Sequence, residues 1–436
     1  MALLSPSLSP AITIKEIDLS GVAPNVSTSV GAFVGNFRWG PVNSQTLVAD
    51  ESGLVRAFAA PNEDNAVDFH SASYFLKYTN SLYIVRGNNG GRNAHSAVTK
   101  VGGDSAVVEN REDWETNVSS SVAAGTLKLG SFIAKYPGSL GNALSVSFCP
   151  STDSDGADYF NGWSYKGSFD RAPTTSAYAT ENGAEKDEVH VAVIDRTGSF
   201  TGTPGTVLET FPHLSVAKGA VTPDGSPNYI SDVLNTQSEY VWNNNFADDS
   251  AFGSLYNNIG QNWGKTPSVD SAVDYSTGSS AWTDSNSKIV LGGGVAGDDL
   301  ENSHIMAGFD LFDDAESIQV DFLIPPQSAA DSDAITIANY LNAIAKDRKD
   351  CVVPVSPHRN GIVGVTTSTA NTNAISFANS LSSSSYLIVD NNYLKVFDKY
   401  NDQYIYIPAN SSTAGIMAAT DFVAAPWFSP AGQRRG

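Results

Sequence analysis

The stretch VSTSVGAFVGNFRWGP, Val26 to Pro41, decides how the first part of this chain folds. Small and apolar residues dominate Ser27 to Phe37, which predicts a β-strand, and Trp39-Gly40-Pro41 supplies a turn that closes it. Two helices and a strand are expected next, over Glu51 to Phe58, Asp68 to Tyr78 and Leu82 to Val85. A strand, two helices and a second strand in this order indicate a layered α/β domain.

Upstream of this stretch, Met1 to Ser20 is expected to form an extended arm. Pro6 and Pro10 oppose a helix, and the residues around Ile12 and Ile14 alternate as they do in an exposed strand. An apolar arm without a nearby hairpin partner needs a partner elsewhere. It pairs either within its own molecule or with the sheet of a neighbouring subunit, and the sequence leaves both possibilities open.

The texture of the chain changes after Gly87, where Gly, Ser, Asn, Asp and Thr dominate and short apolar segments alternate with turn residues. This pattern is typical of an antiparallel β domain with long surface loops. Helix and strand patterns alternate again from Lys288. Helices are expected near Asp298 to Phe312, Asp331 to Lys346, Asn371 to Leu381 and Ser411 to Asp421, and strands over Ser317 to Ile324, Cys351 to Ser356, Tyr386 to Val389 and Tyr404 to Ile407.

The predicted fold is therefore a multidomain α/β (α+β) protein with an extended N-terminal arm over 1–20. A layered α/β core over 21–88 and 288–436 is interrupted by an antiparallel, β-rich insertion over 89–287. The sequence does not indicate whether the insertion is one domain or two.

Composition excludes several classes of protein. Apolar residues make up 41% of the chain and aromatic residues 10%, which suits ordered domains with sizeable cores. The net charge of −21 repels a phosphate backbone, so no direct binding to nucleic acid is expected. Cys149 and Cys351 are too few for a disulfide framework or a structural zinc site. No segment has the length of a membrane span, and the N-terminus lacks the pattern of a signal peptide, so a soluble protein without membrane insertion is expected.

The motifs that could carry chemistry favour structural roles. LGGGVAGDD, Leu291 to Asp299, is glycine-rich, but no Gly-Lys-Ser/Thr follows and its carboxylates oppose an anionic ligand, so a turn and a helix start are expected. DSDGAD, Asp153 to Asp158, imitates the opening of a calcium loop, but Ser164 stands where a bidentate Glu is needed. No metal-binding spacing joins the six histidines, His70, His95, His190, His213, His304 and His358. We therefore expect no catalytic residue, no metal site and no cofactor.

Two alternatives stay open. The segment SPHR, Ser356 to Arg359, follows a predicted strand, where α/β hydrolases and nucleotide-binding enzymes place functional groups, although no GxSxG elbow accompanies it. Aromatic loop residues such as Trp163 and Trp242 either form a binding surface for a host glycan or pin the loops to the β domain. Pinning is favoured, because aromatic rings bury a large area where regular structure is sparse.

Several segments together resemble the contractile-tail sheath proteins of large, myovirus-type bacteriophages. They occur in the family's order and cover both ends of the chain, whereas 88–135 and 151–284 carry little of the resemblance. The segments are VSTSVGAFVGNFRWGP, PNEDNAVDFHSASYFLKYTNSLYIVR (Pro61 to Arg86), KYPGSLGNALSV (Lys135 to Val146), RKDCVVPVSP (Arg348 to Pro357), DKYNDQYIYIP (Asp398 to Pro408) and APWFSPAGQRRG (Ala425 to Gly436).

The resemblance implies a structural subunit of the virion rather than an enzyme. Such subunits assemble in the host cytoplasm into sixfold, hexameric rings that stack as a helical sleeve around the tail tube, and the sleeve contracts to drive the tube through the host envelope for genome ejection. The implied partners are other copies of the chain, the tail tube protein, the baseplate and the tail terminator. The resemblance also implies that the β-rich insertion faces outward.

For the arm, the resemblance implies that Leu8, Ile12, Ile14, Ile17 and Leu19 contact a neighbouring subunit. Sheath proteins continue past the SPAGxxRG segment into a C-terminal domain that contacts the tube and receives neighbouring arms. The resemblance therefore implies that this chain lacks that domain and, alone, is a monomer or a weak oligomer.

Overall fold

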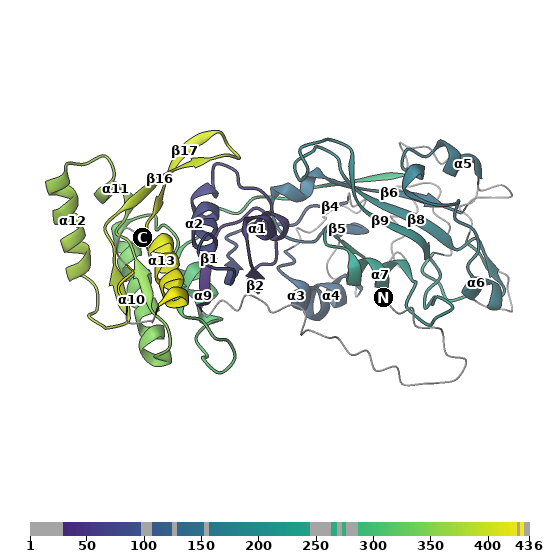
Figure 1. Cartoon of the computed structure of the whole chain (residues 1–436). Coiled ribbons are helices and arrows are strands. Elements are labelled where there is room, and N and C mark those ends of the chain that lie inside the picture. The colour runs from purple at the N-terminus through teal and green to yellow at the C-terminus, as the bar shows by residue number, and fades with distance from the viewer. Residues whose placement is uncertain are drawn as a thin grey trace.

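The computed structural model describes residues 29–96, 107–123, 129–151, 157–244, 263–267, 273–275, 287–424 and 428–430. In Figure 1 the two ends of the described chain form a helix-rich lobe, and the middle of the chain forms a second lobe built on a larger sheet. Helices combine with parallel and antiparallel sheets. The prediction of a mixed α/β multidomain fold is confirmed.

The first lobe, which we call the core, contains the elements that the sequence predicted near both ends. Before the insertion lie β1 (Gly31–Gly35), β2 (Gln45–Val48), α1 (Glu51–Phe58), α2 (Ala66–Leu76) and β3 (Leu82–Arg86). After it lie α9 (Asn302–Asp310), β13 (Phe322–Ile324), α10 (Asp331–Arg348), β14 (Val353–Val355), α11 (Arg359–Ile362), α12 (Thr367–Asn379), β15 (Leu387–Val389), β16 (Tyr393–Asp398), β17 (Gln403–Pro408) and α13 (Asn410–Val423).

The core sheet joins segments from both ends of the chain. Its strand order is β13-β1-β3-β2, with β1 parallel to both neighbours and β2 antiparallel at the edge. Ala32 of β1 lies between Leu323 and Tyr83 in register. A parallel bridge between Phe322 and Val352 leads on to the parallel pair β14–β15. Since β1 pairs with β13 across the whole insertion, the core requires both chain segments.

Helices cover both faces of this sheet, which explains why β1 is buried at every residue. Val34 packs with Phe309 and Leu341 of α9 and α10, whereas Phe33 packs on the other face with Phe75 of α2 and residues of α1 and α13. The alternation follows from the period of a strand, which points successive side chains to opposite faces. At Gly308 of α9 an added Cβ would lie 2.6 Å from Cγ1 of Val34, so a glycine is needed where helix and sheet meet.

The second lobe, which we call the insertion, begins with β4 (His95–Ser96) and ends with β12 (Lys288–Gly292). Its other strands are β5 (Phe132–Ala134), β6 (Leu144–Pro150), β7 (Ala184–Glu185), β8 (Glu188–Asp195), β9 (Thr206–Ser215), β10 (Val241–Asn243) and β11 (Val273–Asp274). Its helices are α3 (Arg111–Asp113), the π-helix η1 (Trp114–Val118), α4 (Ser119–Ala123), η2 (Ser139–Ala143), α5 (Ala157–Gly162), η3 (Lys166–Ser168), α6 (Ala177–Glu181) and α7 (Ile230–Gln237).

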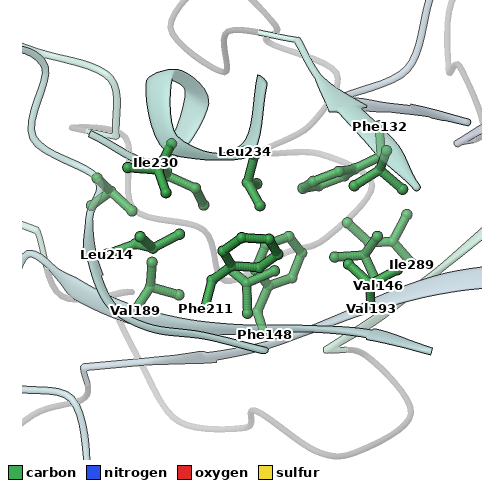
Figure 2. Packing of buried hydrophobic residues seen from close by; sticks show 14 of the residues in the cluster. Phe132, Val146, Phe148, Val189, Val193, Phe211, Leu214, Ile230, Leu234 and Ile289 are labelled. Atoms are coloured by element: carbon green, nitrogen blue, oxygen red, sulfur yellow. The ribbon is translucent and has the colours of Figure 1, made fainter. Parts of the chain in front are cut away.

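An antiparallel sheet of seven strands organises the insertion, in the order β10-β5-β4-β12-β6-β8-β9. Figure 2 shows Ile230 and Leu234 of α7 directed toward Phe148 and Phe211, which rise from the sheet. These residues belong to one buried cluster. A single helix and the loops around it therefore cover one face of the sheet. The antiparallel β structure that the sequence indicated for this region is present.

Two expectations about the second half of the chain need correction. The segment beginning at Lys288 was expected to start the core, but β12 pairs with β4 and β6 inside the insertion sheet, because its partners in register are Ser96 and Val146. The chain crosses back to the core only after Gly292. The strand expected over Ser317 to Ile324 is shorter, because Arg348 binds the carbonyls of Phe312 and Ile318 and holds the preceding residues in a loop.

Candidate functional site

The residues predicted for the arm lie outside the described part of the chain. Leu8, Ile12, Ile14, Ile17 and Leu19 all precede residue 29, where the description begins. Their role as an intersubunit arm stays a prediction.

The glycine-rich loop after β12 does not form a phosphate cradle. The backbone N–H of Gly294 donates to Oδ1 of Asn142 at 2.8 Å, and Nδ2 of Asn142 donates back to the Gly294 carbonyl at 2.8 Å. The N–H of Asp298 donates to the Asn89 carbonyl at 2.8 Å. These amides already have protein partners, and α9 begins only at Asn302. The loop therefore connects the segment that leaves the insertion to Asn142 and to Asn89, which precedes the insertion strands.

Ser356 is held as a structural residue. Its hydroxyl donates to Oδ1 of Asp390 at 2.7 Å and accepts the N–H of Asn410 at 3.3 Å, so no imidazole stands between hydroxyl and carboxylate. Burial raises the pKa of Asp390 to about 6. The adjoining cavity measures about 10 Å³, which is room for no more than one water molecule. The geometry gives no support to the enzyme alternative at this place.

The tryptophans proposed for glycan binding are buried. Trp163 is 1% exposed and donates from Nε1 to Oγ of Ser147 at 3.0 Å. Trp242 is fully buried and donates to the Lys135 carbonyl at 2.9 Å. A sugar stacks on an accessible ring face, so these two side chains cannot bind a glycan in this conformation. Trp163 pins its loop to the sheet, which is the interpretation that the sequence favoured, whereas Trp242 lies in strand β10 and stacks on Trp114 of η1.

The sequence did not reveal a cluster of histidine and acidic side chains beside β8. His213, with a φ of 52°, directs Nε2 to Asp170 at 2.9 Å and Nδ1 to Glu188 at 3.3 Å. His190 accepts the N–H of His213 at 3.0 Å, and burial lowers the pKa of His190 to about 4, which keeps this imidazole neutral. Arg171 completes the cluster by its ion pair with Glu188 at 3.1 Å. The cluster fixes the loop before α6 onto the sheet.

Other specialised sites are missing from the part of the chain that the structure describes. Within it, no three His, Cys, Asp or Glu side chains are grouped as metal ligands. Most of the DSDGAD motif, 152–156, lies outside the described residues. Among the described helices, none combines the length and the apolar character that crossing a membrane requires.

A buried arginine joins the two lobes. Arg86, at the end of β3, donates from Nε to the Phe37 carbonyl at 2.7 Å and from Nη1 to the Gly40 carbonyl at 2.9 Å. Its third bond, from Nη2, reaches the Pro137 carbonyl of the insertion at 2.7 Å. Burial lowers the pKa of Arg86 to about 9. One side chain thus connects the turn that closes β1 to the insertion.

Aromatic contacts reinforce this junction. Trp39, from the Trp-Gly-Pro turn, packs edge to face against Tyr136 and Phe200 with centroid distances of 5.4 and 5.1 Å. Its ring also stacks with Tyr240 of the insertion at 6.3 Å. A cavity of about 430 Å³ borders these rings and α1. Aromatic packing around Trp39 and the hydrogen bonds of Arg86 therefore join the two lobes at this junction.

The hairpin β16–β17 presents the most distinctive exposed surface of the core. Its inner side is anchored: Asp398 pairs with His70 of α2 at 3.0 Å, and Tyr400 donates to Glu51 of α1 at 2.9 Å. Its outer side exposes Phe397 and Tyr404, which are 49% and 65% accessible. A rigidly held hairpin with exposed aromatic rings has the character of a contact surface.

Comparisons with known proteins agree on one family. The chain is 28% identical to the tail sheath protein of Salmonella phage ViI, over 100% of its own length and 74% of that protein. It is 25% identical to the tail sheath protein of Enterobacteria phage T4 and 27% identical to that of Vibrio phage KVP40, in both cases over 98% of its length. It covers 75% and 76% of those two proteins. No protein-family model matches the chain.

Two solved structures are also similar to it. The sheath tail protein of Listeria innocua aligns with a TM-score of 0.45 at 11% identity, and the chain spans 58% of that protein. The sheath tail protein of Desulfitobacterium hafniense aligns with a TM-score of 0.40 at 11% identity, and the chain spans 62% of it. The alignments to the phage proteins run through the core and the insertion alike. The chain is a homologue of phage tail sheath proteins.

Proposed function

We propose that this chain is a structural subunit of a contractile phage tail sheath. The observation that carries the proposal is the sequence relationship to three phage tail sheath proteins over 98% to 100% of the chain. The chemistry of the described residues is consistent with a mechanical role, because the glycine-rich loop and Ser356 are hydrogen-bonded within the fold.

In this proposal the subunits stack in sixfold rings as a helical sleeve around the tail tube. Contraction is a rearrangement of subunits that move as rigid bodies from a metastable packing into tighter contacts. The junction of Arg86 and Trp39 supports such rigid movement, because bending between the lobes would break buried hydrogen bonds and aromatic packing. The sleeve thereby drives the tube through the host envelope.

We also propose the division of labour within the subunit. The core, 21–88 with the segment after the insertion, carries the contacts along the sleeve, and the insertion faces outward. The arm residues Leu8, Ile12, Ile14, Ile17 and Leu19 link neighbouring subunits. Further partners are the tail tube protein, the baseplate and the tail terminator, with assembly in the host cytoplasm before the sleeve becomes part of the virion.

Co-expression tests the proposal. The protein, produced from its complete reading frame together with the tail tube protein of the same phage, should form striated sleeves around the tube in negative-stain micrographs. Omission of the tube protein is the control for the dependence on the tube. Smooth tubes without a sleeve, while the protein remains folded and monomeric, would contradict the proposal.

A further inference from the structure

The two sides of the β16–β17 hairpin differ in character. Val396 and Ile407 point inward and are buried, and Asp398 on that side pairs with His70. The outer side carries Lys395 and Phe397, which lie in register opposite Tyr406 and Tyr404. Arg359 of α11 lies 5.3 Å from the centroid of the Tyr406 ring. We call these five residues the hairpin face: Arg359, Lys395, Phe397, Tyr404 and Tyr406.

The hairpin face combines cations with exposed rings. The ammonium of Lys395 lies 4.9 Å from the centroid of Tyr404, and Phe397 contacts Tyr404 at a centroid distance of 5.3 Å. The net charge of the chain is −21, so a surface that pairs two cations with aromatic rings differs in charge from the chain as a whole. Exposed rings near the turn of an ordered hairpin favour burial against a partner, and the cations favour a partner that is acidic.

A surface with the opposite chemistry lies in the loop after α9. The acidic loop, Leu311–Ser317, exposes the carboxylates of Asp313, Asp314 and Glu316. Leu311 is 37% exposed, and Leu47 of the neighbouring edge strand β2 is 56% exposed. The side chain of Gln45 donates to the Leu311 carbonyl and thereby ties β2 to the loop. The acidic loop thus offers apolar side chains beside carboxylates, as the hairpin face offers rings beside cations.

These two surfaces lie at opposite ends of the core sheet. The hairpin starts where Tyr393 donates to the Pro357 carbonyl and ends where Asn410 donates to the Pro325 carbonyl, which places it beyond the C-terminal ends of β14 and β13. The acidic loop precedes β13 and is held by Arg348 at the end of α10, which places it at the N-terminal ends. Figure 1 shows β17 above the core and α9, which leads into the loop, at its lower side.

We propose that the hairpin face docks on the acidic loop of a second copy of this chain. Because one copy offers the hairpin face at one end and the acidic loop at the other, the contact is heterologous and repeats from copy to copy without closing into a dimer. Tyr404 and Phe397 bury against Leu311 and Leu47, with Tyr404 next to Asp314, while Lys395 and Arg359 approach Asp313 and Asp314. The inference rests on the proposed sheath function, for which it names a surface of contact between subunits.

Cysteine cross-linking of two separately purified variants tests the pairing. Tyr404→Cys and Asp314→Cys chains are mixed at high protein concentration under mild oxidation, and disulfide-linked dimers are resolved on a non-reducing gel. Cys149 and Cys351 are both buried, which keeps the background low. We expect covalent dimers in the mixture, and their loss in either variant alone and in a control mixture of Val221→Cys with Asp314→Cys.

Ionic strength and charge reversal sharpen this test. Raising the salt from about 0.15 M to 1 M shortens the Debye length from about 8 to 3 Å, so the cross-linked yield should fall. Lys395→Glu with Arg359→Glu in the Tyr404→Cys chain should abolish the dimer, and Asp313→Lys in the Asp314→Cys chain should restore it. Dimers of Tyr404→Cys alone, matching the mixture, would show a self-paired face and overturn the proposal, as would no dimer in the mixture.

Assembly separates this inference from the proposed function. If the complete protein forms sleeves and the Lys395→Glu, Arg359→Glu double variant forms them equally well, the docking proposal is wrong while the sheath function stands. If the wild-type protein forms no sleeve but the cross-link appears, the docking stands and the sheath function is wrong. Circular dichroism of each variant verifies that it is folded.

Discussion

Strands β1 and β8 are both buried along their whole length, yet they are stabilised by different means. β1, with the sequence GAFVG, is apolar and lies between two layers of helices. β8 carries Glu188, His190 and Asp195, and these polar side chains bind the loops around the insertion sheet. Both lobes contain buried apolar clusters, but in the insertion single polar residues of β8 also order long loops, whereas β1 contributes apolar contacts alone.

This difference indicates what each lobe can tolerate. An apolar layer spreads its stabilisation over many contacts, so volume changes matter most there. A carboxylate that accepts several backbone N–H groups concentrates its effect in one residue. Substitutions at the junction, at the last residue of β8 and at two charged side chains test this contrast.

The largest effect is expected at the junction. Arg86→Ala removes three hydrogen bonds and leaves three carbonyls without their partner, which should lower the free energy of unfolding by about 3–5 kcal/mol. The exposed Arg56→Ala in α1 is the matched control, with a change within about 0.5 kcal/mol. Urea unfolding followed by tryptophan fluorescence measures both. Equal stability of the two variants would refute the role of Arg86 in joining the lobes.

A smaller and more local effect is expected at Asp195. Its carboxylate accepts the backbone N–H groups of four residues, Gly198, Ser199, Phe200 and Thr201, at 2.9 to 3.0 Å. Asp195→Ala should lower stability by about 2–3 kcal/mol, because these donors lose their acceptor. Hydrogen exchange should accelerate over 196–205 and stay unchanged in β1. Acceleration across the core as well would show that the lobes do not differ in the way described.

In the core, the partly buried carboxylate of Asp68 should make stability fall as the pH rises. Burial raises the pKa of Asp68 to about 7, although its Oδ2 accepts the N–H of Asn36 at 2.8 Å. Between about pH 4 and 7 the folded state holds a proton that the unfolded state has released, so stability decreases through this window. Asp68→Asn should therefore match the wild type at pH 4 and exceed it at pH 8 by on the order of 1 kcal/mol.

A destabilised Asp68→Asn protein at pH 8 would contradict this explanation. Thermal melts at pH 4, 6 and 8 provide the comparison, and Asp64→Asn in the same part of the chain serves as the control.

In the insertion, a buried ammonium should produce the opposite slope. Lys135 lies 3.3 Å from the centroid of the Trp242 ring, and burial lowers its pKa to about 7. Between about pH 7 and 10 the unfolded state binds the proton that the folded state lacks, so stability rises with pH. Lys135→Met should exceed the wild type by on the order of 1 kcal/mol at pH 6 and approach it near pH 10. A gain that does not depend on pH would exclude titration of Lys135 as the cause.

The sequence predicts best those elements of the core whose apolar residues recur with a regular period. α1 begins and ends as predicted, over Glu51–Phe58, because Asp50 caps the N–H of Gly53 and the apolar residues Leu54 and Phe58 recur at helical spacing. α10 and the strand after it were also predicted from periodicity. In these elements the residues that are buried in the core recur at the spacing of a helix or a strand, so the sequence alone reveals them.

The elements and sites that the sequence missed lack such a period. Strand β16 was not predicted. Tyr393–Asp398 carries apolar or aromatic residues on both faces, so the sequence does not show the alternation of apolar and polar residues that indicates a strand. Strand β2 is short and lies at the edge. The cluster of His190, His213 and Glu188 joins residues of two strands whose register, with a bulge between Val189 and Val191, only the fold defines.

Immunogold electron microscopy of intact phage shows where in the virion this chain lies. Antibodies raised against residues 1–436 should decorate the tail shaft along its full length in extended particles and gather over the shortened sheath in contracted ones. Label confined to the head, the baseplate or the fibres, or no label on the virion, would contradict the identification of this chain as the repeating mechanical subunit of the tail.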